Sequence, residues 1–179
     1  MANFLYVDNS NVWIEGMRAS AVAKGLAANI HDAMQHNITD RDWRLDFGKL
    51  HDFAGRNRPG IGRAVLYGSR PPANDSLWIL AKKDGFDVVV HDRNIANREK
   101  KVDTSMVTDM VADSYELMKP ATDEITLISG DRDLQPAVEQ LVKRGFRVDV
   151  VFWDHAAIEL KNCATRFVSL NPHLRILAR

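Results

Sequence analysis

Short apolar runs alternate along the chain with segments in which apolar residues recur at helical spacing. The runs predicted to be strands are Phe4–Val7, Arg63–Gly68, Phe86–Val90, Glu124–Ile128, Phe146–Phe152 and Phe167–Leu170. The predicted helices start near Val12 and cover approximately Leu45–Ala54, Asn74 or Asp75 to Lys83, Asp103–Met118, Leu134–Arg144 and Ala156–Asn162. Strands that alternate with helices are typical of βαβ units. The pattern therefore predicts an α/β fold with a mainly parallel central sheet.

Two polar stretches interrupt this alternation. Asn29–Arg44 is predicted to contain a break in regular structure, and His91–Lys101 is predicted to be a loop. Ser10 or Asn11 is expected to cap the first helix, because short polar side chains accept hydrogen bonds from the N–H groups of a first turn.

Length and composition narrow the class of protein. The chain has 179 residues, of which 45% are hydrophobic, so residues 1–179 are predicted to form one globular domain. No segment approaches the roughly 20 apolar residues of a membrane helix, and the first residues lack a signal peptide. The single cysteine, Cys163, excludes an intrachain disulfide framework. These features predict a cytoplasmic protein without membrane contact, in which Cys163 packs in the core rather than acting as a catalytic thiol.

The formal net charge of the chain is zero. This balance argues against a strongly basic surface that coats nucleic acid without specificity. It leaves room for a local basic groove beside an acidic centre, because opposite charges cancel in the sum.

Carboxylates follow or precede predicted elements at three places. Asp8 comes directly after the first strand, Asp103 opens the long helix, and Asp131 and Asp133 follow the Ser129-Gly130 turn. In an open parallel sheet, ligands bind at the carboxyl ends of the strands, where these residues are expected to converge. Each Asp also suits a helix N-terminus as a simple cap. Asp131 is the stronger candidate for a ligand, whereas Asp133 either binds through water or only caps the helix.

Carboxylates gathered at one sheet edge repel one another unless a cation compensates them. Oxygen ligands without a set of His or Cys residues favour Mg²⁺ or Mn²⁺ over Zn²⁺. A divalent cation of this kind activates water and polarises a phosphoryl oxygen, so phosphodiester hydrolysis is the chemistry that fits. Asp109 and Asp113 are interpreted instead as a solvated helix face, and His155 as a polar loop residue.

At these positions the chain resembles the NYN domains of the PIN-like nuclease superfamily, especially the LabA-like branch. The resemblance covers nearly the whole sequence. It rests on Phe4-Leu5-Tyr6-Val7-Asp8-Asn9-Ser10-Asn11, Lys101-Val102-Asp103 and Ile128-Ser129-Gly130-Asp131-Arg132-Asp133-Leu134, then on Gly145-Phe146-Arg147-Val148, Glu159-Leu160 and Phe167-Val168.

The resemblance implies a Rossmann-like, three-layer α/β/α sandwich with a metal-dependent ribonuclease centre. Asp8, Asp103, Asp131 and Asp133 match the acidic positions of the family, and Asn11 and Ser129 match polar positions beside the centre. The chain departs by having Ser10 before Asn11, where many relatives have Gly or Glu, and Arg132, where Gly is common. Arg132 either reaches a phosphate or pairs with an Asp. The polar segment Asn29–Arg44 is longer than the family core requires.

Basic residues near the predicted centre are candidate phosphate contacts. The segment Asp92–Lys101 carries four cations against two anions, Arg98 and Lys101 among them, and leads into Asp103. Ser69 and Arg70 are expected at the same sheet edge as Asp8. A second basic cluster is formed by Arg56, Arg58 and Arg63. Tyr67 and Trp78 are either base-stacking platforms or, more in keeping with their apolar patterns, core residues.

The leading hypothesis is an endoribonuclease that uses an Asp-cluster Mg²⁺ or Mn²⁺ site to hydrolyse single-stranded or structured RNA. The main alternative is a non-catalytic RNA-binding or regulatory module with the same fold. A phosphatase is disfavoured because an Asp-x-Asp pair is missing after the first strand, and a dinucleotide-binding enzyme because no Gly-x-Gly-x-x-Gly follows it. Trp13, Trp43 and Trp153 are either part of a homodimer face or core residues.

Overall fold

The sheet expected from the alternating pattern is present in the computed structural model, which describes residues 1–56, 60–70, 76–92 and 98–179. Within these residues, six parallel strands are ordered β3-β2-β1-β4-β5-β6. The strands are β1 (Asn3–Asp8), β2 (Ile61–Arg70), β3 (Asp87–Asp92), β4 (Glu124–Ile128), β5 (Arg147–Phe152) and β6 (Arg166–Ser169). The predicted α/β fold with a parallel central sheet is confirmed.

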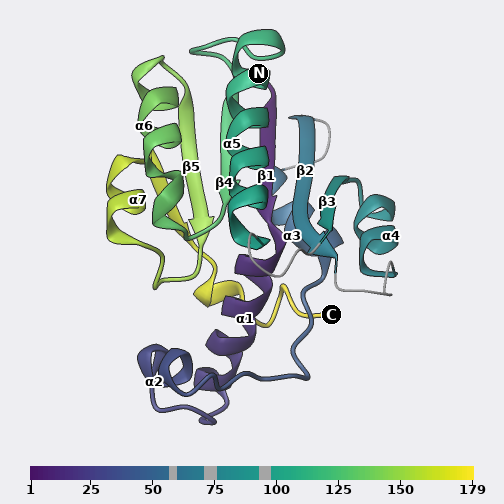
Figure 1. The fold of residues 1–179 in the computed structure, drawn as a ribbon, viewed down its shortest axis with the longest axis vertical. Coiled ribbons are helices and arrows are strands. Elements are labelled where there is room, and N and C mark those ends of the chain that lie inside the picture. Colours follow the sequence, from purple (N-terminus) through teal and green to yellow (C-terminus); the bar gives the residue numbers. More distant parts are fainter. Residues whose placement is uncertain (57–59, 71–75, 93–97) are drawn as a thin grey trace.

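Helices cover both faces of this sheet (Figure 1). They are α1 (Asn9–Ala23), α2 (Ile30–Gln35), α3 (Phe47–Gly55), α4 (Ser76–Lys83), α5 (Arg98–Glu116), α6 (Gln135–Lys143) and α7 (Ile158–Cys163), with short 3-10 turns η2 (Arg132–Leu134) and η3 (Asn171–His173). No helix among the described residues is long and apolar enough to cross a membrane.

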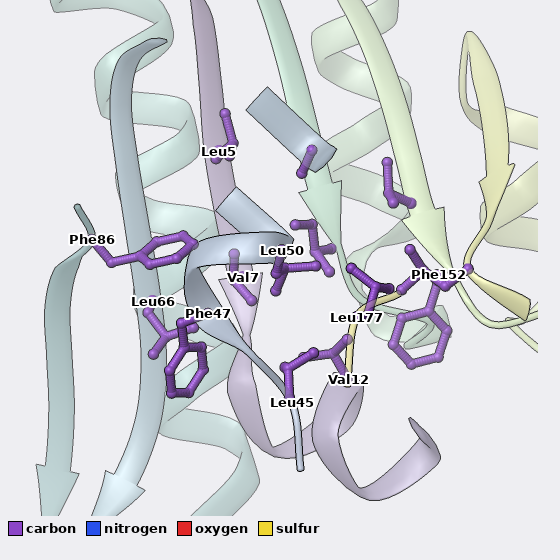
Figure 2. Packing of buried hydrophobic residues seen from close by; sticks show 14 of the residues in the cluster. Leu5, Val7, Val12, Leu45, Phe47, Leu50, Leu66, Phe86, Phe152 and Leu177 are labelled. Carbon is purple, nitrogen blue, oxygen red and sulfur yellow. The ribbon is translucent and has the colours of Figure 1, made fainter. Parts of the chain in front are cut away.

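Successive residues of β1 point to opposite faces, so the buried strand contributes to two hydrophobic clusters. Leu5 and Val7 pack with α1, α3 and α4 on one face, in the cluster that Figure 2 draws together with Leu50 and Leu66. Phe4 and Tyr6 pack with α5, α6 and α7 on the other face. A strand buried on both sides reads as a continuous apolar run, which is what the sequence shows.

The strand order reverses direction between β1 and β4. The chain first builds outward through β2 and β3, and then returns to the other side of β1 with β4, β5 and β6. Val7 lies opposite Ile128 in the register of β1 and β4. The next residues along the chain, Asp8 at the end of β1 and Ser129 just after β4, therefore meet at the topological switch point, where open α/β sheets bind ligands.

Several predicted boundaries are wrong. Helix α1 begins at Asn9, and its cap is Asp8 rather than Ser10 or Asn11. Asp103 does not open the long helix, because α5 already begins at Arg98. Both ends of the predicted loop are likewise regular structure, since β3 continues to Asp92 and α5 starts before Lys101.

The polar stretch predicted as a break contains a helix of its own, α2, capped by Asn29. The choice of Asn74 or Asp75 as the start of α4 lies outside the described residues.

The second half of α1 extends past the carboxyl edge of the sheet toward α2 (Figure 1). Gly16 lets two tryptophan rings pack closely against this helix, because a Cβ there would stand 2.5 Å from the Trp43 ring and 2.8 Å from that of Trp153. Both tryptophans are buried, with exposed fractions of 6% and 0%, and Trp13 packs against the same cluster. Trp43 and Trp153 are therefore core residues, and Trp13 is partly buried beside them.

Helix α5 is fastened to the sheet by buried polar contacts, so the interpretation of Asp109 and Asp113 as a solvated face is wrong. Tyr6 Oη donates to Asp113 Oδ2 at 2.6 Å, and Arg63 Nη1 donates to the same carboxylate. Tyr67 Oη donates to Asp109 at 2.7 Å. Burial, followed by the hydrogen bond to its carboxylate partner, raises the pKa of each tyrosine above its ordinary value. These contacts fix the helix that carries Asp103.

Candidate functional site

A cavity of about 420 Å³ opens at the carboxyl edge of the sheet, beside the switch point. Three of the predicted carboxylates, Asp8, Asp103 and Asp131, line it together. They come from the end of β1, from α5 and from the turn after β4. The other lining residues among those that the structure describes are Ser10, Asn11, Ile14, Glu15, Arg18, Ser69 and Val102. The structure thus brings three of the four predicted acidic residues to one place.

Asp8 and Asp131 also serve as helix caps. Asp8 is 7% exposed, and its Oδ1 accepts a hydrogen bond from the Asn11 N–H at 3.1 Å. Asp131 Oδ1 accepts from the Asp133 N–H at 2.9 Å and caps η2. Because each bond uses one oxygen and fixes the side-chain rotamer, capping orients these carboxylates and is compatible with a second role.

Asn11 joins the two halves of the site. Its Oδ1 accepts from the Gly130 N–H at 2.9 Å and from Ser129 Oγ at 3.2 Å. Ser129 is fully buried, and its hydroxyl also accepts from the Asp131 N–H. Asn11 therefore lines the cavity and positions the turn that carries Asp131, whereas Ser129 supports that turn from beneath.

The fourth predicted carboxylate is not among the described residues that line the cavity. Asp133 is exposed and lines a shallow groove together with Asp103, Thr104, Val107 and Thr108. Asp103, partly buried, lines both this groove and the main cavity. Arg132 Nε lies 3.5 Å from a carboxylate oxygen of Glu159, so it pairs with neither Asp beside it.

The structure describes only some of the predicted phosphate contacts. Ser69 lines the cavity, as expected. The side chains of Arg70, the last residue of β2, and Arg98, the first of α5, lie outside the described residues. Lys101 is exposed on α5 and is not among the residues described as lining the cavity.

The second basic cluster has a structural role. Arg56 pairs with Glu124 and Asp149, and Arg63 pairs with Asp113. Glu124 begins β4, so the Arg56 pair lies at the amino edge of the sheet, opposite the cavity. The prediction that this cluster flanks the site is wrong for Arg56 and Arg63, and Arg58 lies outside the described residues.

The two aromatic candidates belong to the core. Tyr67 is 0% exposed and Trp78 is 5% exposed, in different hydrophobic clusters on opposite faces of the sheet. A base cannot stack on a ring that other side chains cover, which leaves the core interpretation.

Sequence reasoning missed a charged group on α1. Glu15 and Arg18 line the cavity and form an ion pair, and Glu15 Oε2 also contacts His155 Nε2 at 2.6 Å. Residues 11, 15 and 18 fall on one face of a helix by their spacing, and this signal was available in the sequence. Knowing that this face borders the cavity required the fold.

Comparison with known proteins assigns the chain to a family. The model of the NYN domain matches residues 10–171, which is most of the chain. The chain belongs to the NYN domain family. No curated protein matches it significantly. Among solved structures, the chain is similar to VPA0982, a protein of unknown function from Vibrio parahaemolyticus, with a TM-score of 0.66 and 17% identity. The match covers 94% of this chain and 92% of the other, and it shows a shared fold.

The donor atoms of this NYN domain suit a hard cation. The described lining residues offer carboxylate, amide and hydroxyl oxygens, with no His or Cys among them, which fits Mg²⁺ or Mn²⁺. In the described parts of the chain, however, no group of three or more His, Cys, Asp or Glu side chains is arranged to hold a metal ion. Ligation by these residues would therefore be completed by water, which Mg²⁺ commonly retains.

Gly130 provides a test of how the Asp131 turn is positioned in the NYN domain. A Cβ at this residue would lie 2.3 Å from Cε1 of Phe152, whose ring is buried. Gly130→Ala is expected to lower the free energy of unfolding by about 1–3 kcal/mol, because the turn and the ring must move apart. Urea denaturation measures this change. Gly60→Ala is the matched control, since its Cβ would meet nothing within 4 Å; equal stability of the two variants would contradict the prediction.

Proposed function

We propose that this chain is an endoribonuclease that requires Mg²⁺ or Mn²⁺ and belongs to the LabA-like branch of the NYN family. The observation that carries the proposal is the meeting of Asp8, Asp103 and Asp131, from three separate elements, in one cavity at the switch point. Nuclease activity agrees with the membership of the NYN family. The proposed substrate is single-stranded or structured RNA in the cytoplasm.

The side chains of the proposed site would have different roles. Asp8, Asp103 and Asp131 would hold the cation, with Asp133 contributing through water from its neighbouring groove. When bound, the cation supplies activation of water and neutralisation of charge on the phosphoryl oxygens. Asn11 would keep the Asp131 turn and the start of α1 in register, so that the scissile phosphate is aligned between them. Arg70, Arg98 and Lys101 remain proposed contacts to the RNA backbone.

One observation favours a second candidate function. Since the described carboxylates form no group of three able to hold a metal ion, the same cavity is also compatible with an RNA-binding or regulatory module that does not cleave. Such a module predicts RNA affinity without turnover.

The two candidates are separated by a cleavage assay on the purified chain. Labelled single-stranded and hairpin RNAs are incubated with Mn²⁺, with Mg²⁺ or with EDTA, and the products are resolved on a denaturing gel. The nuclease proposal expects internal cleavage with either cation and none in EDTA. RNA binding without turnover under both cations would favour the non-catalytic module, and undiminished cleavage in EDTA would exclude a metal-dependent mechanism.

A further inference from the structure

We propose that Arg18 binds the RNA backbone at a phosphate next to the scissile one, and that Glu15 and His155 hold it in place for this purpose. This inference rests on the proposed function, because it assigns a substrate contact within the same cavity.

The cavity carries more acidic than basic side chains among its described residues. Its described lining residues include four carboxylates, Asp8, Glu15, Asp103 and Asp131, and Arg18 is the one Lys or Arg among them. A nucleic-acid backbone is bound mainly by neutralisation of its phosphates by cations. The guanidinium of Arg18 is therefore the group of the described cavity wall that is suited to this task.

Arg18 lies several turns along α1 from Asp8. Ten residues separate Arg18 from Asp8, which corresponds to about 15 Å of helix axis. Side chains on a helix lean toward its N-terminus, and Arg18 does so by reaching back to Glu15. The backbone of Arg18 is thus displaced from Asp8 along the cavity wall by more than the width of one phosphate group. A neighbouring phosphate is the fitting partner.

The Arg18 side chain is held in place by neighbouring polar groups. Arg18 Nη1 donates to Glu15 Oε1, and Nη2 donates to Asn37 Oδ1 at 3.4 Å. Nε is buried and has no hydrogen-bond partner among the described residues. The other oxygen of Glu15 contacts His155 Nε2, so α1 is tied to the loop after β5 through this carboxylate.

An ordinary ion pair between residues three apart on a helix surface does not account for the low exposure of Arg18 and Glu15. Such pairs are exposed and weak, whereas the side chains of Arg18 and Glu15 are only 17% and 11% exposed. Fixing a planar guanidinium before the ligand arrives reduces the entropy lost on binding, which is the advantage of a preorganised phosphate contact. Glu15 and His155 are accordingly positioning residues.

The test measures RNA affinity separately from cleavage. In an Asp131→Asn background, the anisotropy of a fluorescein-labelled single-stranded oligouridylate is followed in Mg²⁺ over a series of salt concentrations. Arg18→Gln is expected to raise Kd about tenfold, as for one lost charged contact. It should also reduce the slope of log K against log salt by about 0.7, which is the amount for one phosphate on a single strand.

Further variants exclude a merely structural effect. Arg18→Lys keeps the charge and loses the planar fork, so it is expected to retain the salt slope while weakening Kd. Glu15→Gln is expected to weaken Kd less than Arg18→Gln. Lys143→Gln, which removes an exposed cation at the end of α6, is the matched control and should match the background. With Asp131 intact, Arg18→Gln should raise KM for RNA more than it lowers kcat.

The outcomes distinguish this inference from the proposed function. If the background chain binds RNA and Arg18→Gln leaves both Kd and salt slope unchanged, the Arg18 assignment is wrong and the nuclease proposal stands. If Arg18→Lys reduces the slope of log K against log salt as much as Arg18→Gln does, the positive charge at this position is not what binds the phosphate. The assignment is then also wrong. If the chain with Asp131 intact neither binds nor cleaves RNA, both proposals are contradicted.

Discussion

Asp131→Asn is expected to reduce the rate of RNA cleavage at saturating Mg²⁺ or Mn²⁺ by about a hundredfold or more. Groups that merely support a metal ligand cost about 10–100-fold when mutated, so a ligand itself should cost at least as much. The amide keeps an oxygen that can accept the hydrogen bond from the Asp133 N–H, so the cap on η2 is retained. The rate change therefore reports on the lost charge, and single-turnover cleavage measures it.

Asp133→Asn is the matched control for this substitution. It makes the same chemical change two residues away, on an exposed side chain that lines a different groove. Its effect is expected to be about tenfold, well below that of Asp131→Asn, because a contact through water is weaker than direct ligation. Equal losses in the two variants would contradict the division of roles between them, and unchanged cleavage by Asp131→Asn would remove Asp131 from the site.

Asp113→Ala is expected to lower the free energy of unfolding by about 2–3 kcal/mol. The substitution leaves Tyr6 Oη and Arg63 without their shared acceptor at the contact between α5 and the sheet. Breaking a buried ion pair typically costs about 3–5 kcal/mol, and the figure is lowered here because the Arg63 side chain is 29% exposed. Urea denaturation with an unchanged m-value measures the loss.

Glu116→Ala provides the control on the same helix. Glu116 is exposed, so its truncation should change stability by no more than about 0.5 kcal/mol. Tyr6→Phe should fall between the two, at about 1–2 kcal/mol, because Asp113 keeps its bonds to Arg63. Coincident urea midpoints for Asp113→Ala and Glu116→Ala would show that α5 is not fastened by this network.

The central strands were predictable because burial on both faces leaves an apolar run, as in β1. β4 has the bounds expected for it, Glu124–Ile128. The helix ends were less predictable, since Asp8, Ser10 and Asn11 are all capable caps and only the backbone conformation selects Asp8. Helix α2 was missed because its six polar-rich residues carry too little periodicity to separate them from a loop.

The site was predictable as far as topology determines it. Parallel strands must end at one edge, so Asp8 and Asp131 could be expected to meet there, and they line the same cavity. The partners of a helical carboxylate depend on the rotation of the helix against the sheet. Sequence spacing therefore mistook Asp113 for a solvated residue, although it is 5% exposed. The role of Arg18 could not be predicted for the same reason. A charged helix residue is expected to face solvent unless the packing of its helix is known.

The most direct test of the metal-site proposal is a crystal structure of the chain grown with Mn²⁺ and examined by anomalous diffraction. An anomalous peak is expected in the cavity, from a manganese ion bonded to oxygens of Asp8, Asp103 or Asp131 or to waters held by them. Manganese–oxygen distances should be those of a hard cation, close to the 2.0–2.6 Å known for Mg²⁺ and Ca²⁺. A cavity without a peak at a manganese concentration that supports RNA cleavage would contradict the metal-site proposal.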